Sequence, residues 1–239
     1  SGFLGVNSGA GFGAGLAILL FGTSLATYGF AFAFGVLAVI FSYLIAKIYK
    51  AVPTIMLILG GTIVSSVFSA LLTLLKSIAD VNSELPAIVY WLMGSVASVS
   101  YKDFWAVLVI MAGIVGLAFF SWQINVISMG EKEARTMGVN VVFSKRMIIA
   151  CATLATAGAV CISGIIGWVG LIIPHIGRML IGNDTRKLLP VSMSLGAVFM
   201  VTIDTISRSV TTSEIPLGVL TALVGAPFFV FLLKKTKGG

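Results

Sequence analysis

The chain has 239 residues, of which 59% are hydrophobic and only 10% are charged, and its formal net charge is +7. A soluble domain is typically about 45–50% apolar and about 25% charged, so a soluble fold of this composition could not cover its surface with polar groups. The composition therefore excludes a soluble enzyme, a disordered chain and a disulfide scaffold, and it indicates an all-α bundle of helices that cross a lipid bilayer.

Long charge-free stretches predict eight membrane spans, because about 20 apolar residues are needed to cross the hydrocarbon layer. The predicted spans are residues 9–22, 28–49, 53–76, 104–122, 143–163, 168–181, 189–208 and 217–234. We expect one break between Thr23 and Tyr28 and another between Gly164 and Gly170. The first and sixth spans are short.

Glycine recurs in the first predicted span, at Gly9, Gly11, Gly13 and Gly15. The run partly fits the GxGxxA pattern of nucleotide-binding loops, but no strand precedes it and no acidic residue follows about 20 positions later. The same residues form two overlapping GxxxG pairs, which let helices approach closely in lipid. The pattern favours helix packing over nucleotide binding.

The stretch 85–98 is apolar but too short to cross the bilayer comfortably. Pro86 is well placed to begin a helix, and Tyr90 and Trp91 belong to the residue types that gather at lipid headgroups. We interpret the stretch as a re-entrant or interfacial helix.

Residues 130–138 are the most charged part of the chain and lie in a loop between two predicted spans. They can be a solvated connector, but Glu, Lys, Ala, Arg and Met all favour a helix, and Gly130 and Gly138 bracket the run. We predict a short helix on the membrane surface that another protein can bind.

The second half of the chain carries two prolines at expected helix breaks. Pro174 should kink the sixth span or end a half-helix. In the polar turn 183–190, Asn183 or Asp184 can cap the next helix and Pro190 should open the seventh span.

Near the end of that seventh span, Asp204 and Arg208 are four residues apart and share a helix face. Two readings stay open: a self-contained ion pair, or an Arg208 that contacts another protein. Glu214 follows, just before the last span.

The positions of the charges predict the orientation. When the loops are assigned alternately to the two sides, twelve basic residues fall on one side and three on the other. The twelve are Lys47, Lys50, Lys132, Arg135, Lys145, Arg146, Arg178, Arg186, Lys187, Lys234, Lys235 and Lys237. We call this the Lys/Arg-rich side; the positive-inside rule predicts that it is cytoplasmic and that both ends of the chain lie there. Membrane orientation, not nucleic-acid binding, then accounts for the positive charge.

The residue types that carry catalysis or hold metals do not form a recognisable set. There is no Walker P-loop, and a Ser-His-acid triad would need His175, the single histidine, which lies within a span. A metal site at His175 is disfavoured because no carboxylate or second histidine is near it in the sequence. Cys151 and Cys161 lack metal-ligand spacing and are interpreted as small buried apolar residues.

In their order along the chain, these motifs resemble the FecCD family of ATP-binding cassette (ABC) importer permeases. The matching stretches are LGVNSGAGFGAG (4–15), YWLMGSVASVSYKDFW (90–105), GEKEARTMGV (130–139), GIIGWVGLIIPHIGRMLIGNDTRKLLP (164–190), IDTISRS (203–209) and EIPLGVLTALVGAPFFVFLLKK (214–235). Family permeases have ten spans. The resemblance implies that residues 1–239 form a single permease domain that lacks the first two.

The resemblance also implies roles for individual segments. It implies that a cytoplasmic coupling helix, which docks on an ATPase subunit, contains Gly130, Glu131, Glu133, Ala134, Arg135 and Gly138, and that the remaining cytoplasmic interface contains Arg178, Asp184 and Arg186. It also implies that a binding protein docks at Arg208 and Glu214. The inner gate would be Val52, Pro53 and Thr54, and the outer-gate helix would cover about residues 86–97.

The function implied is the membrane subunit of an ABC importer for a metal-chelate nutrient, with an iron-siderophore expected first and haem or cobalamin as alternatives. The expected partners are a second copy of the chain, two ATPase subunits, an extracytoplasmic binding protein and the cell-membrane bilayer. The chain itself is expected to bind no cofactor, because ATP and Mg²⁺ would be held by the ATPase. Two rival functions are an ion-coupled secondary transporter, which usually needs acidic residues within spans, and a non-transporting membrane scaffold.

Overall fold

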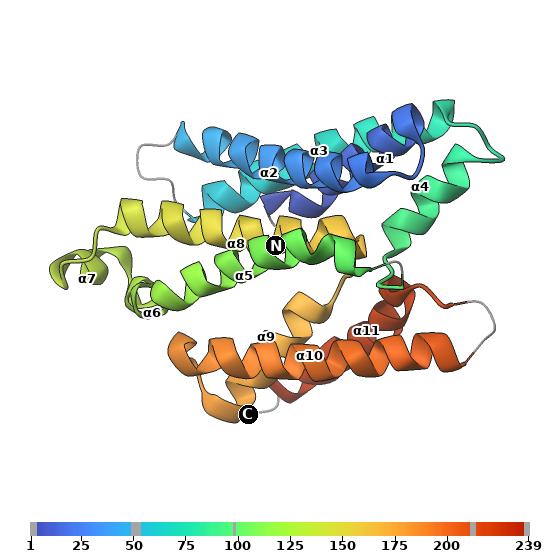
Figure 1. Cartoon of the computed structure of the whole chain (residues 1–239). Coiled ribbons are helices and arrows are strands. Elements are labelled where there is room, and N and C mark those ends of the chain that lie inside the picture. Colours follow the sequence, from blue (N-terminus) through green and yellow to red (C-terminus); the bar gives the residue numbers. More distant parts are fainter. Residues whose placement is uncertain (1–3, 49–53, 98, 211–213, 237–239) are drawn as a thin grey trace. The chain divides into compact units, whose positions relative to one another are not determined.

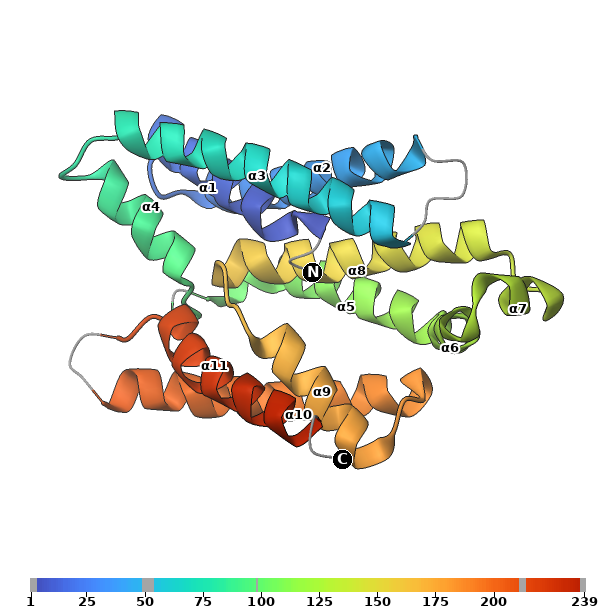
Figure 2. The same cartoon turned by 180° about the vertical axis from the view of Figure 1, so that it is seen from behind.

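The structure is a computed structural model that describes residues 4–48, 54–97, 99–210 and 214–236, with the backbone alone for residues 54, 102 and 231–236. Its regular elements in these ranges are α-helices and short 3-10 segments (Figures 1 and 2). The described helices form two compact units, residues 1–114 with 150–165 and residues 115–149 with 166–239. We call them unit 1 and unit 2.

Unit 1 is built around three long helices that lie side by side in Figures 1 and 2. They are α1 (Val6–Phe21), α2 (Leu25–Lys47) and α3 (Thr54–Ile78). The shorter α4 (Glu84–Met93) packs against α1. The 3-10 helix η2 (Tyr101–Asp103), the first part of α5 (Phe104–Phe119) and the second part of α8 (Val141–Ser163) complete the unit.

The glycines of α1 confirm the packing interpretation. A Cβ atom on Gly9 or Gly13 would collide with the backbone carbonyl oxygen of Phe34 or Phe30 on α2. A Cβ atom on Gly11 would lie 3.0 Å from the side chain of Leu92, and one on Gly15 would lie 3.0 Å from that of Leu72. The two GxxxG pairs therefore face different neighbours, and each lets a helix approach α1 more closely than a larger residue would.

Unit 2 contains the remaining helices. They are α6 (Ser121–Met129), α7 (Glu131–Thr136), α9 (Val169–Ile181), α10 (Thr185–Ser209) and α11 (Leu217–Thr236), with the adjoining parts of α5 and α8. α10 packs against α6, α9 and α11. Where α9 meets α11, the rings of Trp168 and Phe229 lie edge to face, with centroids 6.4 Å apart.

Seven of the eight predicted spans each overlap one described helix, and the span 104–122 overlaps two, α5 and α6. Among the described residues, four helices are long and apolar enough to cross a membrane, namely α2, α3, α8 and α10. The pair α5–α6, bent by 53°, provides up to a fifth span. α1, α4, α9 and the described part of α11 are apolar but shorter. The fold is thus the predicted polytopic all-α bundle, and the crossing of the membrane by α1, α9 and α11 stays a prediction.

Several element boundaries differ from the predicted ones. The predicted span 104–122 is interrupted at Phe120, where α5 gives way to α6. The interfacial helix ends at Met93, because Gly94 adopts a positive φ of 75°. The prediction that Pro190 opens a helix is wrong: α10 begins at Thr185, after the cap residue Asp184, and continues through Pro190. α9 continues through Pro174, so this proline does not end a half-helix, and the alternative of a kink stays a prediction.

Candidate functional site

The predicted surface helix is present as α7, and glycines bound it as expected. Gly130 has a φ of 140° and Gly138 a φ of 78°, a region that disfavours residues with a Cβ atom. Glycine at these positions lets the chain turn sharply on both sides of a helix only six residues long. The helix is therefore a short, sharply delimited element.

One face of α7 is anchored and the other is exposed. Ala134 is fully buried and packs in a cluster with Val126, Val139 and Val141. Lys132, Glu133 and Arg135 are exposed. Ala134, which the resemblance places among the coupling residues, thus holds the helix in position, while its charged neighbours are accessible to a partner.

An ion pair adds a second anchor to α7. Lys145 near the start of α8 donates to Glu131 Oε1, and their side chains are 19% and 37% exposed. Sequence reasoning assigned Glu131 to the partner surface and missed this contact. The pair spans 14 residues of sequence, which is longer than any spacing within a helix that would signal it.

A hydrogen-bonded bridge joins α6 to the start of α10. Asn125 Nδ2 donates to Asp184 Oδ1 at 2.6 Å, and Asn125 Oδ1 accepts from the backbone N–H of Thr185 at 2.8 Å. The bond from Asn125, and then the one from the Arg186 backbone N–H, lower the pKa of Asp184 because they stabilise the charged carboxylate. Because the Asp184 side chain accepts from the Arg186 N–H in the first turn of α10, Asp184, and not Asn183, is the cap of that helix. Asn125 is a residue that sequence reasoning did not identify.

The side chains of Arg178 and Arg186, the other residues of the predicted cytoplasmic interface, are exposed. They flank the loop between α9 and α10 together with Asp184. The structure thus brings these three residues to one turn of unit 2.

At its other end, α10 carries Arg208 in a small charged group. Arg208 Nε donates to Asp204 Oδ2 at 3.0 Å, and Arg208 Nη1 lies 3.9 Å from Glu214 Oε1. The Arg208 side chain remains 44% exposed. The ion pair that was one of the two readings is present, and the exposed part of the guanidinium stays available to a partner.

The predicted inner gate cannot be placed in the same way. Val52 and Pro53 lie outside the described residues. Thr54 begins α3 with its backbone alone described. The gate assignment therefore stays a prediction.

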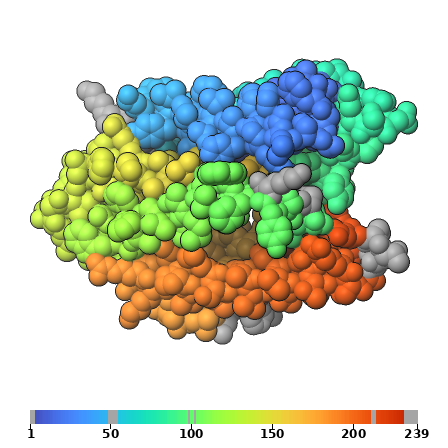
Figure 3. Space-filling view, in the orientation of Figure 1, coloured from blue at the N-terminus to red at the C-terminus, as the bar shows by residue number. Residues whose placement is uncertain are grey.

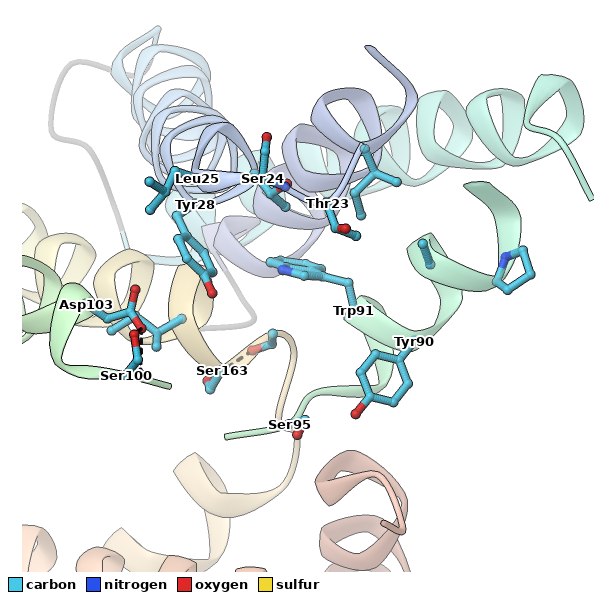
Figure 4. A pocket seen from close by; sticks show the side chains of 16 residues that line it. Thr23, Ser24, Leu25, Tyr28, Tyr90, Trp91, Ser95, Ser100, Asp103 and Ser163 are labelled. Carbon is cyan, nitrogen blue, oxygen red and sulfur yellow. Dashed lines mark hydrogen bonds between the residues drawn. The ribbon is translucent and has the colours of Figure 1, made fainter. Parts of the chain in front are cut away.

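Unit 1 contains a pocket of about 670 Å³ that sequence reasoning did not anticipate. It lies beside α4, the predicted outer-gate helix, and Tyr28, Trp91 and Asp103 are among its lining residues (Figure 4). Asp103 is only 8% exposed and accepts from the Ser100 backbone N–H at 2.8 Å. The S-x-x-D pattern of a capping box was the one sequence signal for this contact.

Comparison of the chain with known proteins agrees with the family resemblance inferred from its sequence. A model of the FecCD transport family matches residues 1–235. The chain is 43% identical to the molybdate import system permease protein MolB of Haemophilus influenzae, over 99% of this chain and 70% of that protein. It is 34% identical to a probable iron chelatin transport system permease protein of Helicobacter pylori, over 98% of this chain and 71% of that protein.

The cobalamin import system permease protein BtuC of Halobacterium salinarum is 40% identical, over 97% of this chain and 62% of that protein. Among solved structures, a metal-chelate type ABC transporter in an inward-facing conformation matches with a TM-score of 0.90 and 40% identity. That match covers 98% of this chain and 75% of the other. The fold of unit 1 and unit 2 is therefore shared with a solved transporter.

Proposed function

Because the chain belongs to the FecCD transport family, it is a permease subunit of an ABC importer, and we propose that it carries a metal-chelate nutrient, with a ferric siderophore as the expected cargo. Relatives are named for an iron chelate, for cobalamin and for molybdate, and each of these contains a metal. The predicted spans carry few charged residues. A pathway with few fixed charges suits a permease whose selectivity resides in a separate binding protein.

The observation that carries the proposed mechanism is α7. An anchored helix with exposed Lys132, Glu133 and Arg135 is a suitable docking element for an ATPase subunit on the Lys/Arg-rich side. ATP-driven closure of an ATPase dimer would then move the helices attached to α7, which is the rigid-body type of transition. The chain would supply the pathway, and the ATPase would supply the energy.

Charge reversal on α7 tests this docking. Arg135→Glu should abolish copurification of the ATPase subunit, because it reverses an exposed charge in the last turn of α7. Lys76→Glu is the matched control, because Lys76 is also a basic residue in the last turn of its helix, α3. Lys76 is predicted to lie on the opposite side of the membrane. Equal copurification in both variants would contradict the docking role.

We further propose that two copies form the pathway at their interface. The support is that α10, which runs along the face shown in Figure 3, carries several exposed apolar side chains that a second copy can cover. Met193, Val198, Val201 and Ile206 of α10 are all at least 40% exposed. Crosslinking of the purified importer should trap a dimer of the chain; a purely monomeric permease would exclude a shared pathway.

The predicted orientation can be read from two variants that each add one exposed cysteine. Cys151 and Cys161 are buried and free, so they should react little with an impermeant maleimide. Asn82→Cys, between α3 and α4, should be labelled from outside intact cells. Lys132→Cys, on α7, should be labelled only after the cells have been permeabilised. The reverse pattern would invert the topology.

A further inference from the structure

Asn125 joins two segments of unit 2 that are distant in the sequence. Its side chain uses both polar ends, donating to Asp184 Oδ1 and accepting from the Thr185 backbone N–H, across 59 and 60 residues. We call this pair of hydrogen bonds the Asn125 bridge. It connects the helix that precedes α7 to the first residue of α10.

The Asn125 bridge does more than cap α10. Asp184 already caps the helix through its own chain, because its Oδ1 accepts from the Arg186 backbone N–H at 3.1 Å. The Asp184 carbonyl oxygen also accepts from the N–H groups of Lys187 and Leu188. A local cap of this kind is the ordinary way to begin a helix. The bonds to Asn125 therefore fix where α10 begins relative to α6.

On its α6 side, the bridge is closely connected to α7. Val126, the neighbour of Asn125, is buried in the cluster that also contains Ala134 of α7. Gly130 alone separates α6 from α7. The ion pair of Glu131 with Lys145 holds α7 further. Since buried clusters do not deform continuously, a displacement of α7 would displace Asn125 as well.

On its α10 side, the bridge holds the first turn of a helix that lacks one backbone hydrogen bond near its start. Pro190 has no N–H, so α10 lacks the hydrogen bond that would otherwise run to the Arg186 carbonyl. On both sides of the proline α10 packs closely on α9, because a Cβ atom on Gly177 of α9 would lie 2.8 Å from Leu188 and 3.1 Å from Ser192 Oγ. The Asn125 bridge secures the first turn, before the proline.

From that turn, α10 continues without interruption for 25 residues, which is about 37 Å at 1.5 Å per residue. Its far end carries Arg208 with its partners Asp204 and Glu214. A single helix therefore has the bridge to the α7 region at one end and the proposed binding-protein site at the other.

We propose that Asn125 is a positioning residue that couples α7 to α10, so that docking of the ATPase at α7 and docking of a binding protein near Arg208 influence each other through α10. The inference rests on the proposed function, which assigns these two partners. Coupling between distant sites requires an element that both sites bias, and it is reciprocal for binding. α10 with the Asn125 bridge is such an element.

The test uses the full-length permease, reconstituted in proteoliposomes with its ATPase and its binding protein. ATP hydrolysis is measured with and without loaded binding protein. Asn125→Ala should lower the stimulation by at least about fivefold, the lower range of allosteric coupling. The copurified ATPase and the basal hydrolysis should match those of the wild type.

A second variant and a control separate coupling from helix capping. Asp184→Ser keeps a capping side chain but loses the partner of Asn125, so it should show the same loss, and the double variant should lose no more than either single variant. Asn140→Ala is the control. It removes a local cap at the start of α8, where Asn140 Oδ1 accepts from the Phe143 N–H at 3.1 Å, and it should leave the stimulation unchanged.

The outcomes separate this inference from the proposed function. Wild-type stimulation in Asn125→Ala and Asp184→Ser would overturn the coupling role and leave the permease function intact. A loss of copurified ATPase in Asn125→Ala alone would make Asn125 part of the docking surface, which also contradicts the inference. A wild-type permease that recruits no ATPase would overturn the proposed function and the inference together.

Discussion

The α1–α3 bundle of unit 1 and the α6–α7–α10 region of unit 2 are held by different chemistry. In the bundle, glycines bring backbones into contact, and Phe12, Phe34 and Phe68 pack with ring centroids 5.2–6.3 Å apart. In unit 2, side chains from separate helices meet through an ion pair and the Asn125 bridge. Contact of backbones tolerates few substitutions, whereas an exposed polar contact between helices contributes little stability by itself. The two regions should therefore respond differently to single substitutions.

The largest expected effect lies in the bundle. Gly13→Leu would drive a side chain into the Phe30 carbonyl and the Phe34 side chain, and overpacking of this kind should destabilise the protein by about 3 kcal/mol or more. The check is the thermal midpoint of the purified protein in detergent. Gly29→Ala in α2 is the control, because a Cβ atom there meets nothing within 4 Å. It should stabilise by about 0.5–1 kcal/mol.

A smaller effect is expected in unit 2. Lys145→Ala removes the ion pair with Glu131, whose side chain is 37% exposed. The free energy of unfolding, followed through the thermal midpoint, should therefore fall by about 1 kcal/mol or less. ATP-dependent uptake should nevertheless fall clearly, because α7 loses one of its two anchors. A stability loss as large as that of Gly13→Leu would remove the contrast between the two regions.

The smallest expected effect is a dependence on pH at Asp184. Its pKa is lowered in the folded protein, chiefly by the bond from Asn125, so this contribution to stability is fully present above the pKa of the unfolded chain, about 3.9. It is lost as the pH falls through the lower, folded pKa. Between pH 7 and pH 3, wild type should lose slightly more thermal stability than Asp184→Asn. An equal loss in both proteins would assign the acid sensitivity to other groups.

The sequence predicted the elements of the fold better than it predicted their contacts. Hydrophobic lengths and the GxxxG pairs act locally, so the helices and the packing face of α1 could be anticipated. The interruption at Phe120 has no proline or glycine at that position to signal it. The start of the seventh span was placed too late because Pro190 was read as its opening residue, although Asp184, one of the two predicted caps, lies upstream.

The candidate site shows the same division. The glycines around α7 and the spacing of Asp204 and Arg208 were local signals, and both local features are present. Asn125 with Asp184 was not predictable, because 59 residues separate them and their proximity depends on how α6 packs against α10. The pocket beside α4 likewise depends on residues from several elements of unit 1.

The most direct test of the importer function is uptake driven by ATP alone. Proteoliposomes containing the permease, its ATPase and its binding protein are given a labelled ferric siderophore, with cobalamin and molybdate in parallel, while ionophores abolish every ion gradient. We predict accumulation of the ferric siderophore that requires ATP and is lost in Arg135→Glu. Uptake that needs an ion gradient and proceeds without ATP would contradict the account and favour an ion-coupled transporter.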